Sequence, residues 1–289
     1  MPTTVKSLIL VLFIIAGTTN SQSQNAQIPE ISVKKLWATD KILETPESVI
    51  YDDVHNTIYV SNISGSPLEK DGNGFISKLS CNGEIEKLKW IEGLNAPKGM
   101  GIFEDKLYVT DIDRVVEISI SEGRVLKKYK SRQAQFLNDI SIDPSGVVYI
   151  SDNRVNTIFR LWNKKIDPWL NSPDFAFPNG LCAENDRLLI GNEGFILSVD
   201  YQTKKITRFI EDTDFIDGLE AYEDGQYLVS DFLGSVHLVS RGNEKAKLLD
   251  TSTEEIMAAD IDFIGEKKIL LVPTFYDNRI FAYQIKHGE

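Results

Sequence analysis

The stretch ISIDPSGVVYISDNRVNTIFRLWNKKIDPWL, residues 140–170, contains four short segments with the alternating or continuous apolar pattern of β-strands. The turn-forming groups PSG, NRVN and NKK separate these segments. A second region, residues 219–250, follows the same plan with LEAYE, QYLVSD, SVHLVS and KAKLLD. Each region therefore predicts one sheet of four antiparallel strands.

The second strand of this unit recurs six times along the chain. The copies are IYVSN (58–62), LYVTD (107–111), VYISD (148–152), LLIGN (188–192), YLVSD (227–231) and ILLVP (269–273). Five of the six copies end in Asn or Asp. A short motif precedes each copy: PES at Pro46, PKG at Pro97, LND at Leu137, PNG at Pro178, IDG at Ile216 and AAD at Ala258. A repeat of about 40 residues with four short strands is typical of a β-propeller blade.

The last repeat is one strand short, because only KHGE follows DIDFIG, KILLVP and RIFAYQI. The segment ISVKKLWA, residues 31–38, precedes the first repeat and can supply the missing strand. Pairing the two ends of the chain would close the ring and remove exposed sheet edges. The sequence thus predicts an all-β fold: a six-bladed β-propeller with four antiparallel strands per blade, as a single domain over residues 28–289.

The first residues have the pattern of an export signal. Lys6 precedes the apolar run LILVLFIIAG, which is short for a bilayer span and is followed by small polar residues. We expect a signal peptide over residues 1–27, cleaved between Asn20 and Ile28, and a periplasmic or secreted protein. A retained membrane anchor is the alternative.

Charge and cysteine content narrow the possible partners. The formal net charge of -12 disfavours nucleic acid and anionic membrane surfaces. The repeat places Cys81 on an outer turn and Cys182 on an inner strand, so we expect no disulfide between them. The expected partner is a small molecule, bound by a monomer that has no membrane contact after signal cleavage.

The innermost strands of a propeller line its axis, so their first residues should form a ring around one mouth of the tunnel. Read in register, this ring consists of Glu47, Lys98, Asn138, Asn179, Asp217 and Ala259. Converging carboxylate and amide oxygens would suit a divalent cation. Asn, Asp and Gly are also common in turns, so a purely structural role remains an equal alternative at this point.

The four motifs PES with Glu47, LND with Asn138, PNGL with Asn179 and IDGL with Asp217 occur in a fixed order. In that order they resemble the gluconolactonase, senescence-marker protein (regucalcin) and luciferin-regenerating enzyme family, over essentially the whole mature chain. The resemblance implies one divalent ion held by Glu47, Asn179 and Asp217, with Ca²⁺ as first choice and Zn²⁺, Mn²⁺ or Mg²⁺ as alternatives. It also implies that Asn138 contacts the substrate or a water molecule on the metal.

The activity implied by this resemblance is metal-assisted hydrolysis of a lactone or related ester, with Asp217 placed to take a proton from water. Two departures put sugar lactones in doubt as substrates. Phe136 stands where sugar lactonases of the family commonly have an arginine, and Ile140 replaces the usual glycine.

Lys98 places an ammonium group in the ring. It could pair with Glu47 or Asp217 and weaken metal binding, or it could hold a substrate carboxylate or oxyanion as part of the catalytic set with Asp217 and Asn138. A lysine that merely reaches the rim of the mouth is an equally good interpretation.

Other chemistries lack the necessary residues. The three histidines, His55, His237 and His287, fall on a turn, an outer strand and the tail, which leaves no histidine dyad and no Ser-His-Asp triad. No P-loop pattern occurs. The alternative to an enzyme is a non-catalytic periplasmic propeller that binds a ligand or another protein.

Overall fold

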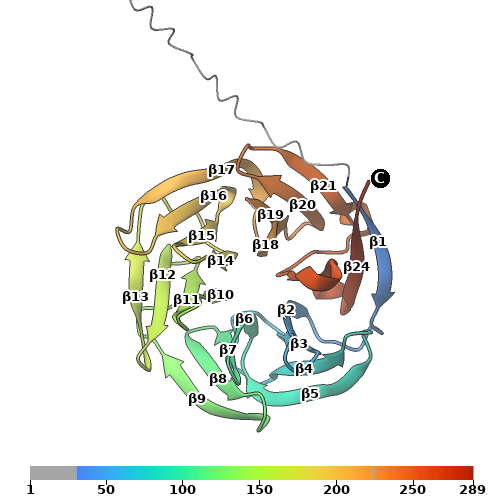
Figure 1. Cartoon of the computed structure of the whole chain (residues 1–289). Helices are drawn as coiled ribbons and strands as arrows, with labels where there is room; N and C mark the ends of the chain where they lie inside the picture. The colour runs from blue at the N-terminus through green and yellow to red at the C-terminus, as the bar shows by residue number, and fades with distance from the viewer. Residues whose placement is uncertain (1–30, 224, 289) are drawn as a thin grey trace, which may run out of the picture.

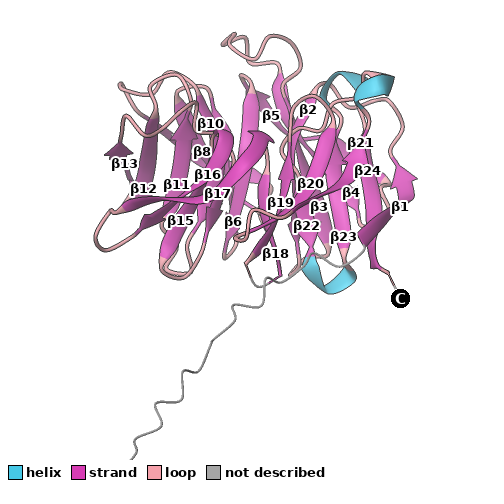
Figure 2. Cartoon of the chain, turned by 90° about the horizontal axis from the view of Figure 1, so that it is seen from above, coloured by secondary structure: helices cyan, strands magenta, loops and turns pink. Residues whose placement is uncertain are grey.

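The computed structural model describes residues 31–223 and 225–288, which form six four-stranded antiparallel sheets arranged as a closed ring (Figure 1). The predicted six-bladed β-propeller is therefore confirmed. Viewed edge-on, the sheets stand side by side and their strands run between the two faces of the ring (Figure 2). The expected signal peptide lies outside the described residues.

The first three blades follow one another along the chain, each with its innermost strand first. Blade one contains β2 (Pro46–Asp52), β3 (Thr57–Asn62), β4 (Gly74–Ser80) and β5 (Ile85–Leu94). Blade two contains β6 (Pro97–Phe103), β7 (Lys106–Asp111), β8 (Arg114–Ser119) and β9 (Arg124–Lys130). Blade three contains β10 (Leu137–Ile142), β11 (Val148–Asp152), β12 (Thr157–Trp162) and β13 (Lys165–Asn171).

Blades four to six continue the pattern. Blade four contains β14 (Leu181–Ala183), β15 (Arg187–Gly191), β16 (Glu193–Asp200) and β17 (Ile206–Phe215). Blade five contains β18 (Leu219–Glu223), β19 (Gln226–Ser230), β20 (Ser235–Ser240) and β21 (Lys245–Asp250). Blade six contains β22 (Asp262–Ile264), β23 (Ile269–Pro273), β24 (Ile280–His287) and β1 (Ile31–Ala38). Three short 3₁₀ helices lie in or near blade six: η1 (Ser252–Glu254), η2 (Gly265–Lys267) and η3 (Phe275–Asp277).

The ring closes through the two ends of the chain, as the short last repeat predicts. β1 pairs antiparallel with β24, from Ile31 opposite His287 to Ala38 opposite Phe281, and the two strands lie side by side in Figure 1. Thr39 continues the contact, since its N–H donates to the carbonyl of Ile280 and its hydroxyl accepts the N–H of Ile280, both at 3.0 Å. The N-terminal strand thus removes the free edge that blade six would otherwise expose.

The Asn or Asp that ends the second strand in most repeats has a structural task. In four blades its side-chain oxygen accepts backbone N–H groups from the segment that leads into the same blade. The pairs are Asn62 with Glu44, Asp111 with Asn95 and Ala96, Asp152 with Gln135 and Phe136, and Asn192 with Ala176. These hydrogen bonds hold the entry loop of each blade against its second strand, close to the tunnel mouth.

The opening motif needs a glycine because the next blade packs closely against it. A Cβ atom at Gly99 would lie 2.5 Å from the Cα of Asp139, and one at Gly180 would lie 2.7 Å from the carbonyl oxygen of Asp217. Both distances are too short for non-bonded atoms. Glycine at these positions therefore allows the innermost strands to approach closely enough to form a narrow ring.

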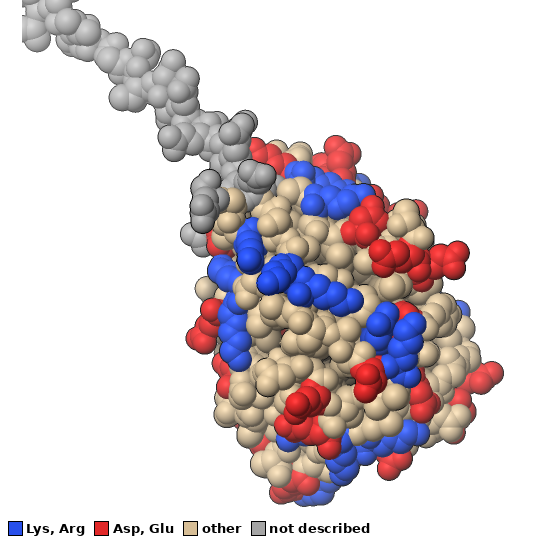
Figure 3. Space-filling model, turned by 90° about the vertical axis from the view of Figure 1, so that its right-hand side faces the viewer, with Lys and Arg blue, Asp and Glu red and all other residues tan. Residues whose placement is uncertain are grey.

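The apolar core lies mainly between neighbouring blades. Val115 of blade two, for example, packs in one cluster with Ile150 and Phe159 of blade three. Cys182 is buried and Cys81 lies on a turn, and both are free thiols, as expected. Basic and acidic side chains are interspersed on the side of the ring that carries β1 and β24 (Figure 3). Within the described residues, no helix has the length and apolar character that crossing a membrane requires.

Candidate functional site

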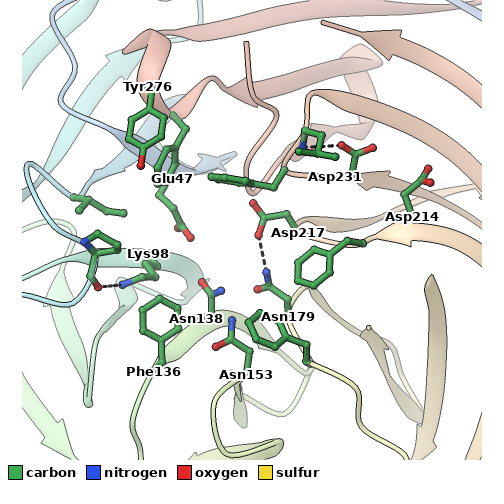
Figure 4. A pocket seen from close by; sticks show the side chains of 17 residues that line it. Glu47, Lys98, Phe136, Asn138, Asn153, Asn179, Asp214, Asp217, Asp231 and Tyr276 are labelled. Carbon is green, nitrogen blue, oxygen red and sulfur yellow. Dashed lines mark hydrogen bonds between the residues drawn. The ribbon is translucent and has the colours of Figure 1, made fainter. Parts of the chain in front are cut away.

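One mouth of the central tunnel opens into a cavity of about 670 Å³ to which all six blades contribute. Five of the six residues that the motif register places in the ring line this cavity: Glu47, Lys98, Asn138, Asn179 and Asp217 (Figure 4). The sixth, Ala259, is fully buried in an apolar cluster with Ile63 and Phe275, two residues that line the cavity. The structure therefore brings five residues of the predicted ring together at one mouth, along with further polar residues that the register did not include.

The backbone holds these side chains in equivalent places. Glu47, Lys98 and Asn138 are each the second residue of an innermost strand. Asn179 and Asp217 stand two positions before β14 and β18, and their N–H groups donate to the carbonyls of Gly191 and Ser230 in the neighbouring strand. All five side chains are buried, and those of Asn179 and Asp217 are placed by these backbone hydrogen bonds just before their strands begin.

Glu47 carries an unsatisfied oxygen atom. Its Oε2 is buried and has no hydrogen-bond partner. Burial raises the pKa of Glu47 well above its usual range, and the carboxylates of Asp217 and Asp260 raise it further, whereas Lys98 lowers it. A buried carboxylate with an open oxygen is costly unless a proton or a cation satisfies it.

Asn179 and Asp217 form a directly bonded pair. Asn179 Nδ2 donates to Asp217 Oδ1 at 2.6 Å, which leaves the amide oxygen of Asn179 directed into the cavity (Figure 4). Burial raises the pKa of Asp217 to about 7, although this hydrogen bond opposes the shift. Asp217 can therefore exchange a proton near neutral pH.

Asn153 is a further polar lining residue that the sequence interpretation missed. It follows β11 directly, and its Oδ1 is buried without a hydrogen-bond partner. Asn138 comes from the first strand of the same blade and lies next to it (Figure 4). The sequence interpretation treats NRVN as a turn. Asn153, the first residue of NRVN, directly follows the second strand of its blade at the end nearest the cavity, and this place in the repeat is the signal that could have indicated it.

Lys98 lies within the cavity wall rather than at the rim. Its ammonium donates to the carbonyls of Ala96 at 2.9 Å and Pro67 at 3.2 Å, and it sits 4.6 Å from the centre of the Phe136 ring. Burial lowers the pKa of Lys98 to about 8, while the carboxylates of Glu47 and Asp111 raise it. The rim interpretation is therefore wrong for the side chain as a whole, which is almost completely buried.

The donor atoms around the mouth fit a hard divalent cation. Glu47 offers an open carboxylate oxygen, Asn179 an amide oxygen and Asp217 a second carboxylate, and all of these residues face one cavity (Figure 4). Oxygen donors of this kind are the ligands that Ca²⁺ and Mg²⁺ prefer. Lys98 directs its hydrogen bonds at the backbone carbonyls of Ala96 and Pro67 rather than at either carboxylate, so it leaves these oxygens accessible.

A second group that could bind a metal lies at the edge of the same cavity. Asp214, Asp231 and His237 bring one possible donor atom each to within 4.8 Å of one another. His237, expected on an outer strand, belongs to the third strand β20, and burial lowers its pKa. In this structure Lys245 forms an ion pair with Asp214, which places a cation there already.

Comparison with known proteins supports the fold. No family model matches the sequence, and no curated protein matches it. A streptogramin B lyase structure matches with a TM-score of 0.65 and 12% identity, over 89% of this chain and 98% of that chain. A catalytically inactive virginiamycin B lyase from Staphylococcus aureus with quinupristin matches with a TM-score of 0.62 and 14% identity, over 88% and 99%.

A structural-genomics protein assigned as a gluconolactonase also matches, with a TM-score of 0.65 and 13% identity, over 90% of this chain and 94% of that chain. At 12 to 14% identity these likenesses establish a shared fold. The last of them agrees with the family resemblance that the PES, LND, PNGL and IDGL motifs indicate.

Proposed function

We propose that this protein is a divalent-metal-dependent hydrolase of lactones or related esters, with metal and substrate bound together at the tunnel mouth. The observation that carries the proposal is the buried, unpartnered Oε2 of Glu47 in the same cavity as the Asn179–Asp217 pair. The motif resemblance and the fold shared with a protein assigned as a gluconolactonase point the same way. Ca²⁺ is the first candidate ion, and Zn²⁺, Mn²⁺ and Mg²⁺ are the alternatives.

Glu47, Asn179 and Asp217 would hold the ion. When bound, a divalent cation supplies Lewis-acid polarisation of a carbonyl group and lowers the pKa of water. Asn179 orients Asp217 through its hydrogen bond, so that Asp217 Oδ2 remains for contact with the ion or with a water proton. Without the ion, burial raises the pKa of Asp217 to about 7, and with the ion bound its carboxylate would be the nearest group to accept that proton.

The remaining polar residues would position the substrate. Asn138 and Asn153 present amide groups to the cavity from one blade, and an amide can donate to the substrate carbonyl region and accept from a leaving hydroxyl group. Lys98, by contrast, is bound to backbone carbonyls, and its positive charge beside Glu47 would lower the affinity of the site for a metal ion.

Metal removal and replacement test this proposal. The mature protein is stripped with a chelator, dialysed, and assayed by pH-stat against a panel of lactones and esters after addition of Ca²⁺, Mn²⁺, Zn²⁺ or Mg²⁺. We expect hydrolysis that depends on one of these ions and that Asp217→Asn lowers on the order of a hundredfold, while Asp167→Asn, at an exposed residue outside the cavity, leaves it unchanged. Stoichiometric ligand binding without any hydrolysis would instead support the periplasmic binding propeller.

Export to the periplasm or the exterior, a monomeric state and independence from nucleic acid and membranes remain part of the proposal. N-terminal sequencing of protein from an exporting host tests the cleavage, and retention of Met1 or Pro2 would contradict it.

A further inference from the structure

The cavity has two chemically different parts. Its polar floor is formed by Glu47, Lys98, Asn138, Asn179 and Asp217, and its wall is aromatic. Six aromatic side chains line it: Phe136, Phe177, Phe215, Phe232, Phe275 and Tyr276. They come from loops and strand ends of the four consecutive blades three to six. Phe275 and Phe232 also pack in the apolar cluster around Ala259, whereas the other four aromatic residues belong to none of the apolar core clusters of the described residues.

Five of these aromatic residues form two groups, and the rings within each group pack on one another. Phe177 and Phe215 lie with ring centres 5.3 Å apart, and Phe275 contacts Phe232 at 5.0 Å and Tyr276 at 4.7 Å. Such offset and edge-to-face contacts fix the rings and keep apolar faces turned toward the cavity. The wall is thus an ordered apolar surface.

Strained backbone and exposed apolar side chains both occur at this wall. Phe177 and Phe275 have φ angles of +58° and +50°, and they are the two aromatic residues with positive φ in the described part of the chain. Bulky residues rarely adopt this conformation, and strain of this kind is characteristic of binding sites. Tyr276, Leu233 and Phe177 are also 66%, 75% and 43% exposed, so the rim presents large apolar groups to solvent.

The wall has few groups that could recognise a polyhydroxylated ring. Lys98 is the one basic residue among those lining the cavity, and its ammonium is already bound to two backbone carbonyls and the Phe136 ring. Asp231 accepts N–H groups from Leu233 and Ser235, and Asp214 pairs with Lys245. Sugar hydroxyl groups placed against the phenyl faces of this wall would therefore lose water without gaining partners there, which is unfavourable, because the amides of Asn138 and Asn153 could serve only the end of the substrate that reaches them.

From these observations we infer that the substrate is a lactone or ester whose carbonyl group is attached to a bulky apolar or aromatic body. The carbonyl would reach the floor at Glu47, Asn138 and Asp217, while the apolar body would fill the space between the two aromatic groups. A cavity of about 670 Å³ is large enough for such a molecule. This inference rests on the proposed hydrolase function for the reacting group, but the apolar selectivity of the wall is independent of the chemistry.

Binding of inert analogues tests the inference separately from catalysis. A tetrahydropyran carrying a phenyl group and anhydroglucitol have similar rings, neither contains a hydrolysable bond, and calorimetry measures the affinity of each for the purified protein. We expect the phenyl compound to bind at least about tenfold more tightly than anhydroglucitol. Equal affinity, preference for anhydroglucitol, or no binding of the phenyl compound would overturn the inference.

Variants at the rim locate the binding surface. The double variant Leu233→Ser with Tyr276→Ser removes two exposed apolar groups and should weaken binding of the phenyl compound on the order of tenfold. Trp162→Ser is the matched control, because Trp162 is an exposed aromatic residue outside this cavity. An equal loss in the control, or no loss in the double variant, would contradict the assignment.

Hydrolysis of a phenyl-substituted δ-lactone, measured in parallel with added metal, separates the two claims. Tight binding of the inert phenyl compound without hydrolysis of the lactone would retain the apolar pocket and reject the hydrolase. Hydrolysis of gluconolactone in preference to the phenyl-substituted lactone would retain the hydrolase and reject the apolar substrate.

Discussion

Asn179 Nδ2 donates a hydrogen bond to Asp217 Oδ1 at 2.6 Å, which joins the opening motifs of blades four and five across the tunnel mouth. This bond fixes the orientation of the Asn179 amide: its nitrogen faces Asp217 and its oxygen faces the cavity (Figure 4). A carboxylate and an amide oxygen are thereby presented to the same space as the open Oε2 of Glu47. The Asn of PNG and the Asp of IDG therefore act as one unit at the mouth of this protein.

Asp217→Asn should remove both metal affinity and activity. The substitution keeps the shape of the side chain but eliminates one of the two negative charges available to the ion. We expect a loss of metal affinity of at least about tenfold and a fall in turnover on the order of a hundredfold. Metal content by elemental analysis and initial rates measure the two effects, and wild-type values for both would show that Asp217 has no role.

The stability of the metal-free protein should fall as the pH rises from 5 to 7. The pKa of Asp217 is about 7 in the folded state, above its value of about 3.9 in an unfolded chain. Between these values the folded protein retains a proton that the unfolded chain has lost, so the free energy of unfolding decreases by up to about 1.4 kcal/mol per pH unit for this group. Glu47 and Asp260, whose pKa values burial also raises, contribute in the same direction.

Urea unfolding at several pH values measures this slope. Asp217→Asn should show a shallower decrease than the wild type, because one titrating group is absent. Saturating divalent metal should raise the stability most at pH 7, where the ligands must be deprotonated to bind it. Identical slopes for wild type and variant would mean that Asp217 does not titrate in this range.

Lys98→Met should tighten metal binding and leave turnover at saturating metal unchanged. The ammonium is held by the carbonyls of Ala96 and Pro67, so it acts on the carboxylates of the site through its charge. Removal of that charge should increase metal affinity on the order of tenfold, at a cost of about 1–3 kcal/mol in stability because two carbonyls lose their donor. Calorimetric metal titration tests the affinity, and lost turnover with metal retained would show instead that Lys98 contacts the substrate or oxyanion.

Deletion of β1 should destabilise the whole ring. A protein that begins at Thr39 lacks the strand that pairs with β24, and it therefore exposes an unpaired edge in blade six. We expect a clear fall in the thermal midpoint relative to a protein that begins at Glu30, together with a tendency to aggregate. Unchanged melting of the shorter protein would show that closure through the N-terminal strand contributes nothing to stability.

The fold could be predicted in detail because the same local physics is repeated six times. Strand-end residues such as Asp111 and Asn192 bind the entry loops of their blades, and Gly99 and Gly180 permit close contact with the next blade. Each of these tasks requires a particular residue type, so it leaves a pattern that the sequence displays. The ring of polar residues followed from the same register.

Much of the rest of the site depends on loops that the repeat does not specify. Asn153 follows the repeating strand β11 directly and could have been found from the repeat, whereas Tyr276 lies in the 3₁₀ helix η3, outside the repeating strands. Asp214 and His237 are neighbours because β17 bends at irregular pairings with β16, and no periodic pattern encodes that bend. Residues of this kind could not be identified from strand periodicity.

The most direct test of the central claim is the crystal structure of the protein soaked in Mn²⁺, with the ion located by its anomalous scattering. The account predicts one ion at the tunnel mouth, within about 2.6 Å of oxygen atoms of Glu47, Asn179 and Asp217. An ion bound only by Asp214, Asp231 and His237, or carboxylates of Glu47 and Asp217 too far apart to share one ion, would contradict it.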